Sequence, residues 1–312
     1  MTATRTAFLF PGQGSQKVGM GRAWAARSPA ARAAFEEASS ALGIDLGRLC
    51  WEGPESDLQL TANTQPAILT ASVAIHRALA ECGRDVAVAV AGHSLGEYSA
   101  HVAAGTLGLA EAASLVRRRG ALMQDAVPVG VGAMAAVIGL DAGAVAELAA
   151  DAAQGEVFSV ANFNAPEQTV IAGHRAAVER AIALARARGA KRAIPLPVSA
   201  PFHCALMAPA REGLRPALEA AAFATPRIPV VANVDAVPVT SGEAARAALI
   251  RQVDGPVRWV DSVRHLWEEL AVRRFVEVGP GSVLCGLVKR IVPEAETIAL
   301  AEPEALARWA LR

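Results

Sequence analysis

The chain contains few aromatic residues, few cysteines and no excess of charge of either sign. Only 4% of its 312 residues are Phe, Trp or Tyr and 53% are hydrophobic, so the core has to be built mainly from Ala, Val and Leu. Thirty Lys and Arg residues balance 30 Asp and Glu residues, which gives no sign of a nucleic-acid partner. The four cysteines, Cys50, Cys82, Cys204 and Cys285, show no CxxC spacing. We therefore expect buried free thiols in a reducing compartment.

Long apolar runs are also absent. The apolar run within the N-terminal segment MTATRTAFLFPGQG is too short for a signal peptide, and no stretch of about 18 apolar residues occurs elsewhere. We therefore expect a cytoplasmic protein with no membrane partner. A length of 312 residues exceeds one typical domain, but it also suits a large α/β domain that carries an insertion.

Short β-rich runs alternate with long Ala-rich helical patterns over most of the chain. Residues 6–10 predict a buried strand that ends in the glycine-rich turn PGQGSQ, and residues 85–92 predict the next strand. Helical patterns are expected near 20–42, 64–82, 94–107 and 110–126, and further strands at 229–234 and from 275 onward. This repetition of strand, turn and helix predicts a parallel sheet covered on both faces.

The pattern changes between residues 128 and 197. Strands and helices are expected there in the order β-α-β-β-α-β, with the helices at 141–153 and 174–189. That order is the ferredoxin-like signature. We therefore predict a large α/β-hydrolase-like domain with a parallel sheet, formed by residues 1–127 and 198–312, and a small inserted ferredoxin-like α+β subdomain, formed by residues 128–197.

Residues 92–96, GHSLG, fit the G-x-S-x-G pattern of a nucleophile elbow. In that motif the serine occupies a sharp strand-to-helix turn, where side chains on the flanking residues would clash. The N–H of Leu95 would then face a developing oxyanion at the start of the next helix. The alternative is an N-cap serine after a tight turn. The position of Ser94 between a predicted strand and a predicted helix favours a nucleophile.

A serine hydroxyl needs a base at neutral pH, and the chain contains six histidines. Four of them lie in helical or polar sequence and are interpreted as packing or solvated residues: His76, His101, His174 and His265. His93 belongs to the elbow itself, and we expect it to hold the loop by hydrogen bonds. His203, in PVSAPFHCALM at a predicted strand-to-helix junction, is the candidate base, with a satisfied core histidine as the alternative. No acidic residue between Ser94 and His203 lies at a convincing sheet-edge turn, so either a backbone carbonyl orients the base or the triad interpretation fails.

A series of short motifs extends from residue 10 to residue 281. They are FPGQGSQ at 10–16, QPAI at 65–68, GHSLGEYSA at 92–100, RG-LMQ across 119–124, FN-P at 163–166, VSAPFH at 198–203 and EVGPG at 277–281. In order and spacing these motifs resemble those of the malonyl-CoA:acyl carrier protein transacylases and of the acyltransferase domains of polyketide synthases. The resemblance covers almost the whole chain.

The resemblance implies a serine–histidine dyad without an acid. By this resemblance, Ser94 would be the nucleophile, and His203 would be the general base and later the general acid. The main-chain carbonyl of Gln252 would orient His203. The N–H groups of Gln13 and Leu95 would form the oxyanion hole. A phosphate-cradling loop, the alternative for FPGQGSQ, would need the GK[ST] ending of a P-loop, which is absent.

The resemblance also implies the residues that bind the substrate. Arg119 matches the carboxylate-binding arginine of the family, although by itself it is one of three successive arginines in a helical pattern. Phe202, Asn162 and His93 complete the implied substrate-binding set. A bulky ring at Phe202 would crowd an α-methyl branch, and with Leu95 after the nucleophile this favours unbranched malonyl.

The implied reaction is a ping-pong transfer of malonyl from malonyl-CoA to the phosphopantetheine thiol of acyl carrier protein, through an ester on Ser94. It needs no metal and no redox cofactor, and we expect a monomer. An acidic carrier protein would need a local basic surface, for which the candidates are Lys191, Arg192, Lys289 and Arg290. A serine hydrolase such as a thioesterase, or a non-catalytic subunit that only docks the carrier protein, remains an alternative. Fatty acid synthesis, polyketide synthesis and malonate decarboxylation are all open as the pathway.

Overall fold

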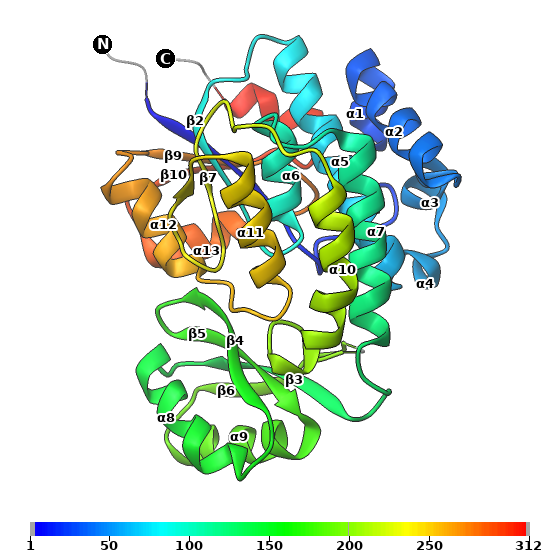
Figure 1. The fold of residues 1–312 in the computed structure, drawn as a ribbon. Coiled ribbons are helices and arrows are strands. Elements are labelled where there is room, and N and C mark those ends of the chain that lie inside the picture. Colours follow the sequence, from blue (N-terminus) through cyan, green and yellow to red (C-terminus); the bar gives the residue numbers. More distant parts are fainter. Residues whose placement is uncertain (1–3, 199, 310–312) are drawn as a thin grey trace.

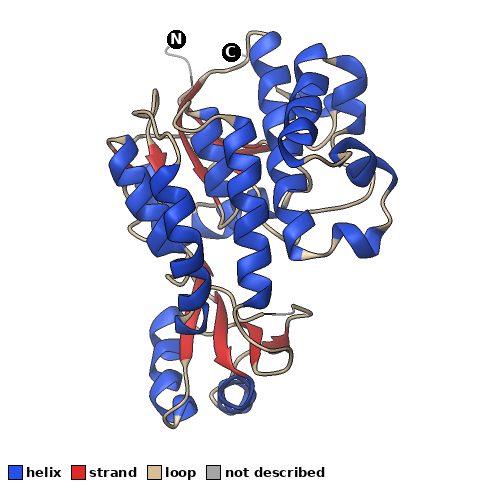
Figure 2. Cartoon of the chain, turned by 45° about the vertical axis from the view of Figure 1, so that its right-hand side comes forward, coloured by secondary structure: helices blue, strands red, loops and turns tan. Residues whose placement is uncertain are grey.

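The structure, a computed structural model, describes residues 4–198 and 200–309 and contains two β-sheets (Figures 1 and 2). The larger sheet has the strand order β10-β9-β1-β2-β7-β8. Its strands are β1 (Thr6–Phe10), β2 (Ala87–Gly92), β7 (Val230–Val231), β8 (Pro238–Val239), β9 (Arg274–Glu277) and β10 (Glu296–Ala299). Every neighbouring pair is parallel except β7 and β8. The predicted α/β class with a mostly parallel sheet is therefore confirmed.

Helices pack on both faces of this sheet. They are α1 (Arg22–Arg27), α2 (Pro29–Leu42), α3 (Leu46–Glu52), α4 (Glu55–Leu58), α5 (Thr61–Glu81), α6 (Gly96–Ala103), α7 (Leu109–Asp125), α10 (Ala208–Ala220), α11 (Gly242–Gln252), α12 (Trp259–Glu268) and α13 (Val283–Ile291), with short 3₁₀ turns η1 (Ala205–Met207) and η2 (Pro303–Arg308). Phe8 and Phe10 of β1 pack into one core with α2, α5 and α7. Ala7 and Leu9 point the other way, toward α12 and α13. Because side chains alternate along a strand, a strand covered on both faces is expected to be almost entirely apolar, as TAFLF is after Thr6.

The smaller sheet is antiparallel and lies in the lower part of Figure 1. In chain order its elements are β3 (Gly132–Ile138), α8 (Ala142–Ala153), β4 (Phe158–Ala165), β5 (Gln168–His174), α9 (Arg175–Ala187) and β6 (Arg192–Pro195), and the strand order is β4-β5-β3-β6. Helices α8 and α9 cover one face. The other face packs against Phe202, Cys204 and Leu206, so the small sheet supports the segment that carries His203.

Two expectations from the sequence are wrong in detail. The strand expected at 229–234 is only two residues long, because the chain turns back at Ala236, which has a φ of 57°, and forms the antiparallel strand β8. Cys82 is exposed, because it caps the C-terminus of α5 beyond the last buried turn, whereas Cys50, Cys204 and Cys285 are buried free thiols as expected. Among the described residues, no helix is long and apolar enough to cross a membrane.

Candidate active site

Ser94 occupies a sharp turn between β2 and α6. Its φ is 52°, in the left-handed region, which costs a non-glycine residue on the order of 1 kcal/mol. The flanking glycines are required by close backbone contacts. A Cβ on Gly92 would lie 1.9 Å from the carbonyl oxygen of Gly96, and a Cβ on Gly96 would lie 2.0 Å from that of Phe10. The turn therefore forms only with glycine on both sides, and it presents the serine hydroxyl at the carboxyl end of the central strands.

The hydroxyl of Ser94 lies within hydrogen-bonding distance of a histidine. Ser94 Oγ is 2.7 Å from His203 Nε2, and His203 Nδ1 is 3.1 Å from the carbonyl oxygen of Gln252 and 3.0 Å from that of Gly255. Because both partners of Nδ1 can only accept, Nδ1 carries the proton and Nε2 is free to accept one from the serine. The structure thus places the Gln252 carbonyl where it was expected and adds that of Gly255. No carboxylate of the described residues is hydrogen-bonded to this histidine.

The surroundings of His203 keep its ring neutral. Burial and the positive charge of Arg119 lower the pKa of His203 to about 3, with a smaller effect in the same direction from His93. The hydrogen bonds to the carbonyls of Gly255 and Gln252 oppose this shift of the pKa without cancelling it. The His203 ring is therefore unprotonated at neutral pH.

With His203 as the base for Ser94, as predicted from the sequence, this shift predicts an unusual pH profile for acylation of the serine. A histidine with an ordinary pKa of about 6.5 would lose roughly 30-fold in rate between pH 8 and pH 5. Because the pKa of His203 is lowered to about 3, we expect kcat/KM for acylation to stay constant over that range. Folding stability should decrease as the pH falls below about 6.5, because the unfolded chain then binds a proton at this histidine and the folded chain does not.

Quenched-flow acylation measured at each pH, with circular dichroism to show that the protein stays folded, tests this prediction. An acidic limb with a pKa near 6.5 in the folded protein would contradict it.

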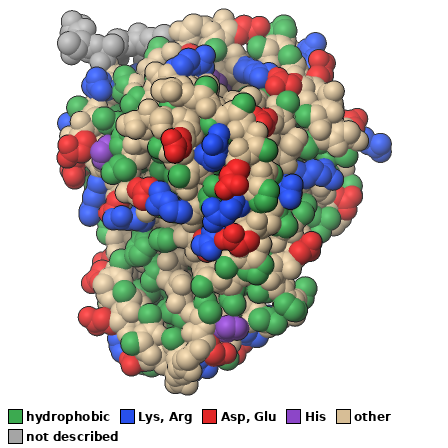
Figure 3. Space-filling model, in the orientation of Figure 1, with side chains coloured by type: hydrophobic (Ala, Val, Ile, Leu, Met, Phe, Trp, Pro, Cys, Tyr) green, Lys and Arg blue, Asp and Glu red, His purple; other side chains and the backbone are tan. Residues whose placement is uncertain are grey.

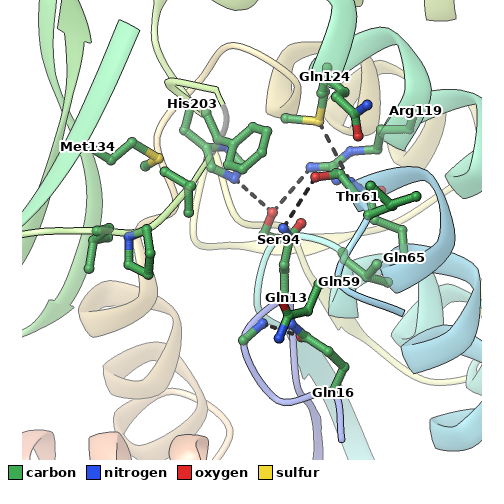
Figure 4. Close-up of a pocket in the computed structure, with 18 of the residues that line it drawn as sticks. Gln13, Gln16, Gln59, Thr61, Gln65, Ser94, Arg119, Gln124, Met134 and His203 are labelled. Atoms are coloured by element: carbon green, nitrogen blue, oxygen red, sulfur yellow. Dashed lines mark hydrogen bonds between the residues drawn. The ribbon is translucent and has the colours of Figure 1, made fainter. Parts of the chain in front are cut away.

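Arg119 reaches the same hydroxyl from the opposite side (Figure 4). Its side chain is 1% exposed, and its Nη2 lies 3.2 Å from Ser94 Oγ. Nη1 donates to Gln65 Oε1 at 2.9 Å, and Nη2 also donates to Gln252 Oε1 at 2.9 Å. Two amide oxygens therefore hold the guanidinium beside the serine.

The neighbouring arginines of α7 point elsewhere. Arg118 is exposed and donates to the carbonyl oxygen of Gly213 at 3.1 Å, and Arg117 is half-buried and is not among the residues that line the cavity around Ser94. Burial lowers the pKa of Arg119, whereas the nearby Tyr98 and Glu97 raise it. A guanidinium so placed is a buried cation with neutral hydrogen-bond partners, which is suited to receive an anionic group.

Ser94, His203 and Arg119 line one cavity of about 820 Å³. The residues predicted from the sequence that line it are Gln13, His93, Ser94, Leu95, Arg119, Asn162, Phe202 and His203. Gln252 does not line the cavity. It contacts two residues that do, His203 through its carbonyl oxygen and Arg119 through its side-chain oxygen. Met134 of β3 and Asn162 of β4 also line the cavity, so it lies between the elements of the two sheets. Ser199 of the VSAPFH motif lies outside the described residues.

Two backbone N–H groups beside the serine have no hydrogen-bond acceptor among the described residues. Within the described chain, neither Gln13 N nor Leu95 N donates a hydrogen bond, although both residues line the cavity. The turn after β1 lies directly against the elbow, since a Cβ on Gly12 would be 2.4 Å from the carbonyl oxygen of His93. Gly14 has a φ of 100°, which favours glycine. The arrangement leaves two donors available for an anionic oxygen.

His93 and Asn162 form part of the cavity wall. His93 Nε2 lies 2.8 Å from Asn164 Oδ1, and its ring centroid lies 5.5 Å from that of Trp259. Burial lowers the pKa of His93. The hydrogen bond to Asn164 joins the elbow to β4. Asn162 is 6% exposed, and its strand is joined to the segment at Val257 by a parallel bridge.

The family model for the acyl transferase domain matches residues 7–304. The chain belongs to the acyl transferase family. This confirms the membership predicted from the motifs.

Relatives of this acyl transferase are similar along nearly their whole length. The chain is 53% identical to malonyl CoA-acyl carrier protein transacylase of Escherichia coli K12 over 304 residues, which cover 97% of the chain and 98% of the relative. An acyl carrier protein S-malonyltransferase from Vibrio cholerae superposes with a TM-score of 0.95 at 50% identity, covering 98% of this chain and 99% of the other. A malonyl-transacylase solved in complex with a type II PKS acyl-carrier protein superposes with a TM-score of 0.94 at 48% identity, covering 97% and 98%.

Three polar residues of the acyl transferase site were not assigned from the sequence. Gln65 holds Arg119, as described above. Asn233 accepts from Ser94 N through Oδ1 at 2.7 Å and donates from Nδ2 to the carbonyl oxygen of Gly92 at 2.7 Å. Glu97, which is fully buried, accepts from the N–H of Asn233. Gln65 and Glu97 stand within motifs that matched the family, and this was the available signal. Asn233 had no signal beyond the end of a predicted strand.

The remaining histidines of the acyl transferase do not line the cavity: His76, His101, His174 and His265. His76 and His101 are buried in helices, as expected of packing residues. The solvated position expected for His174 is wrong. It is half-buried, and its Nδ1 accepts from the N–H of Val157 at 2.9 Å, because it ends a strand of the small sheet. Over residues 4–198 and 200–309, no group of three His, Cys, Asp or Glu side chains could hold a metal ion.

Proposed function

We propose that this acyl transferase moves a malonyl group from malonyl-CoA to the phosphopantetheine thiol of acyl carrier protein, through an ester on Ser94. The observation that carries the proposal is that Ser94 Oγ lies 2.7 Å from His203 Nε2 and 3.2 Å from Arg119 Nη2, a base on one side and a buried cation on the other. The names of the relatives support this choice of donor and acceptor.

The first half-reaction forms the ester. Ser94 Oγ attacks the thioester carbon of malonyl-CoA, and His203 Nε2 takes the hydroxyl proton. The N–H groups of Gln13 and Leu95 donate to the oxyanion of the tetrahedral intermediate. The carbon–sulfur bond then breaks, the CoA sulfur takes the proton from His203, and malonyl remains as an ester on the serine.

The second half-reaction reverses these roles. The phosphopantetheine sulfur of the carrier protein attacks the ester carbon as His203 takes the thiol proton. The bond between carbon and Ser94 Oγ breaks, and His203 returns the proton to that oxygen. Since one thioester is exchanged for another, no net oxidation occurs.

Arg119 gives the site its preference for an acyl group that carries a carboxylate. A guanidinium can donate two parallel hydrogen bonds to the two carboxylate oxygens of malonyl. The bound carboxylate also compensates the positive charge that lowers the pKa of His203, so the base becomes stronger once malonyl is bound. Phe202, which lines the cavity, limits space for an α-methyl branch and favours unbranched malonyl.

A serine hydrolase such as a thioesterase would share the elbow and the histidine but would have no use for a buried cation beside the nucleophile. Incubation with labelled malonyl-CoA, with and without carrier protein, separates the two functions. We expect the label to move to carrier protein and to remain on the enzyme when carrier protein is omitted. Rapid release of free malonate in both samples would identify a hydrolase.

We infer that the carrier protein docks on a basic group formed by Arg192, Lys289 and Arg290 at one end of the small sheet. Arg192 and Gln168 both pair with Ile138 in adjacent strands, and Arg290 donates to the Gln168 side chain. Since strands lie about 4.8 Å apart, Arg192 and Arg290 share one end of this sheet. Lys191 pairs with an acidic residue, whereas Arg192, Lys289 and Arg290 form no ion pair within the described chain. Charges of both signs are interspersed over the face drawn in Figure 3, so such a group would act locally.

Arg192→Glu should raise the KM for carrier protein several-fold and leave the KM for malonyl-CoA nearly unchanged, because rim charges act mainly on association. Added salt should raise the KM for carrier protein more in the wild type than in the variant. Arg48→Glu, which changes an exposed arginine of α3, is the control. Equal salt sensitivity of both KM values would contradict this docking surface.

We further propose a two-part architecture for the chain. The order β3-α8-β4-β5-α9-β6 and the sheet order support a ferredoxin-like subdomain formed by residues 128–197, inserted into an α/β-hydrolase-like domain formed by residues 1–127 and 198–312. We propose a cytoplasmic monomer, which sedimentation of the purified protein and fractionation of cells would test.

A further inference from the structure

Glu97 is a carboxylate enclosed in the first turn of α6, three residues after Ser94. Its side chain is 0% exposed. Burial of a carboxylate is costly unless donors compensate for the lost water. Within the described chain Glu97 Oε1 has no hydrogen-bond partner and lies 3.9 Å from His101 Nε2. One of its oxygens, Oε2, accepts from the N–H of Asn233 at 3.0 Å and from Gln252 Nε2 at 2.8 Å. Glu97 and its two partners, Asn233 and Gln252, do not line the cavity. The reaction steps above therefore give Glu97 no role.

The two residues that Glu97 holds both bind the backbone of Ser94. Asn233 Oδ1 accepts from Ser94 N at 2.7 Å, and Gln252 Nε2 donates to the carbonyl oxygen of Ser94 at 2.9 Å. The N–H and the C=O of the nucleophile are thus each held by a side chain. One carboxylate oxygen of Glu97 holds both residues, Asn233 through its backbone N–H and Gln252 through its side chain.

The orientation of the Gln252 amide depends on the same contact. Glu97 Oε2 is the acceptor in this contact, so the amide nitrogen of Gln252 faces it. The amide oxygen then points the other way and accepts from Arg119 Nη2 at 2.9 Å. The backbone carbonyl of Gln252 in turn accepts from His203 Nδ1. Gln252 therefore connects Glu97 to the base and to the cation.

We propose that Glu97 is a positioning residue that clamps Ser94, through Asn233 and Gln252, in the left-handed conformation from which its hydroxyl meets His203. A φ of 52° is strained for serine and persists only where the surroundings fix it. Displacement of a reacting atom by about 1 Å can cost about 100-fold in rate. This role rests on the proposed function of Ser94 and concerns how its geometry is maintained.

The clamp predicts different results for two substitutions of similar size. Glu97→Gln keeps an oxygen that can accept from Asn233 and Gln252, whereas Glu97→Met fills the same space without an acceptor. We expect the single-turnover acylation rate, per active site titrated, to fall about 10- to 100-fold in Glu97→Met, with malonyl-CoA and acetyl-CoA alike. Glu97→Gln should recover most of that rate. The dissociation constant for malonyl-CoA should change little in both variants.

Other roles of Glu97 predict other results. A space-filling role predicts wild-type rates in both variants, a role of the negative charge predicts equal losses in both, and a role limited to Arg119 predicts a loss with malonyl-CoA only. Each of these results would overturn the clamp. Glu277→Gln is the matched control, because Glu277 is also fully buried and its Oε2 accepts from the N–H of Cys285 outside the cavity wall. Its acylation rate per active site should equal that of the wild type.

If Glu97→Met does not fold, Glu97→Asp, whose shorter side chain withdraws the acceptor from the Asn233 N–H and from Gln252 Nε2, is measured in the same way. A slower acylation supports the clamp, and a wild-type rate overturns it. Ser94→Ala, assayed in parallel, keeps the two proposals separate. Label retained on that variant would refute the nucleophile itself, whereas wild-type acylation by the clamp variants, with Ser94→Ala inactive, would refute only the clamp.

Discussion

Ser94→Ala should leave the fold intact and reduce malonyl transfer by about 10⁴-fold or more, because loss of a nucleophile disables the whole catalytic group. The backbone strain at a φ of 52° is the same for alanine as for serine, so the free energy of unfolding should change little. The measurement is kcat for transfer to carrier protein, together with thermal unfolding.

Ser99→Ala is the matched control for this substitution. Ser99 is a fully buried serine of α6 whose hydroxyl has no hydrogen-bond partner in the described chain. Its removal should leave kcat unchanged. A Ser94→Ala enzyme that retains more than a few per cent of the wild-type kcat would show that another group attacks the thioester.

Arg119→Ala should reduce kcat/KM for malonyl-CoA by about 10²- to 10⁴-fold, since losing one partner of a buried charge pair costs about 3–5 kcal/mol. Transfer of acetyl, which has no carboxylate, should be nearly unchanged or faster. Arg119→Lys should recover only part of the malonyl activity, because an ammonium group lacks the planar fork of a guanidinium. The comparison requires kcat/KM for both substrates in the wild type and both variants.

Arg118→Ala controls for the loss of a positive charge on the same helix. Arg118 is exposed and donates to a backbone carbonyl away from the cavity, so its removal should affect neither substrate. If Arg119→Ala lowers malonyl and acetyl transfer equally, Arg119 maintains the structure of the site and the preference for malonyl has another origin.

The parts of the fold that the sequence predicts are those with a strong local pattern. TAFLF is apolar at every position after Thr6 and forms a strand buried on both faces, and the helical pattern at 110–126 forms α7 within one residue at each end. The full strand predicted at 229–234 is wrong, although the apolar residues of this segment are typical of a strand. Its length is set by the hairpin at Ala236, which the apolar pattern does not encode.

In the site, too, the residues with a local sequence pattern are predictable and those that depend on distant contacts are not. Ser94 and its flanking glycines are recognisable because the elbow is a local conformation with a local glycine requirement. Asn233 and Glu97 are 136 positions apart, and Gln252 lies 155 positions from Glu97. Their contacts exist only after the larger sheet has brought α6, α11 and the end of β7 together. No spacing in the sequence could have paired them.

The central claim is that malonyl is carried as an ester on Ser94 and passed to carrier protein. The most direct measurement is to react the protein with labelled malonyl-CoA in the absence of carrier protein, remove the CoA, map the label by peptide mass spectrometry, and then add carrier protein. We predict about one malonyl per chain on the peptide that contains Ser94, and complete transfer of that label to the phosphopantetheine thiol. Label on another residue, or label on Ser94 that carrier protein does not remove, would contradict the account.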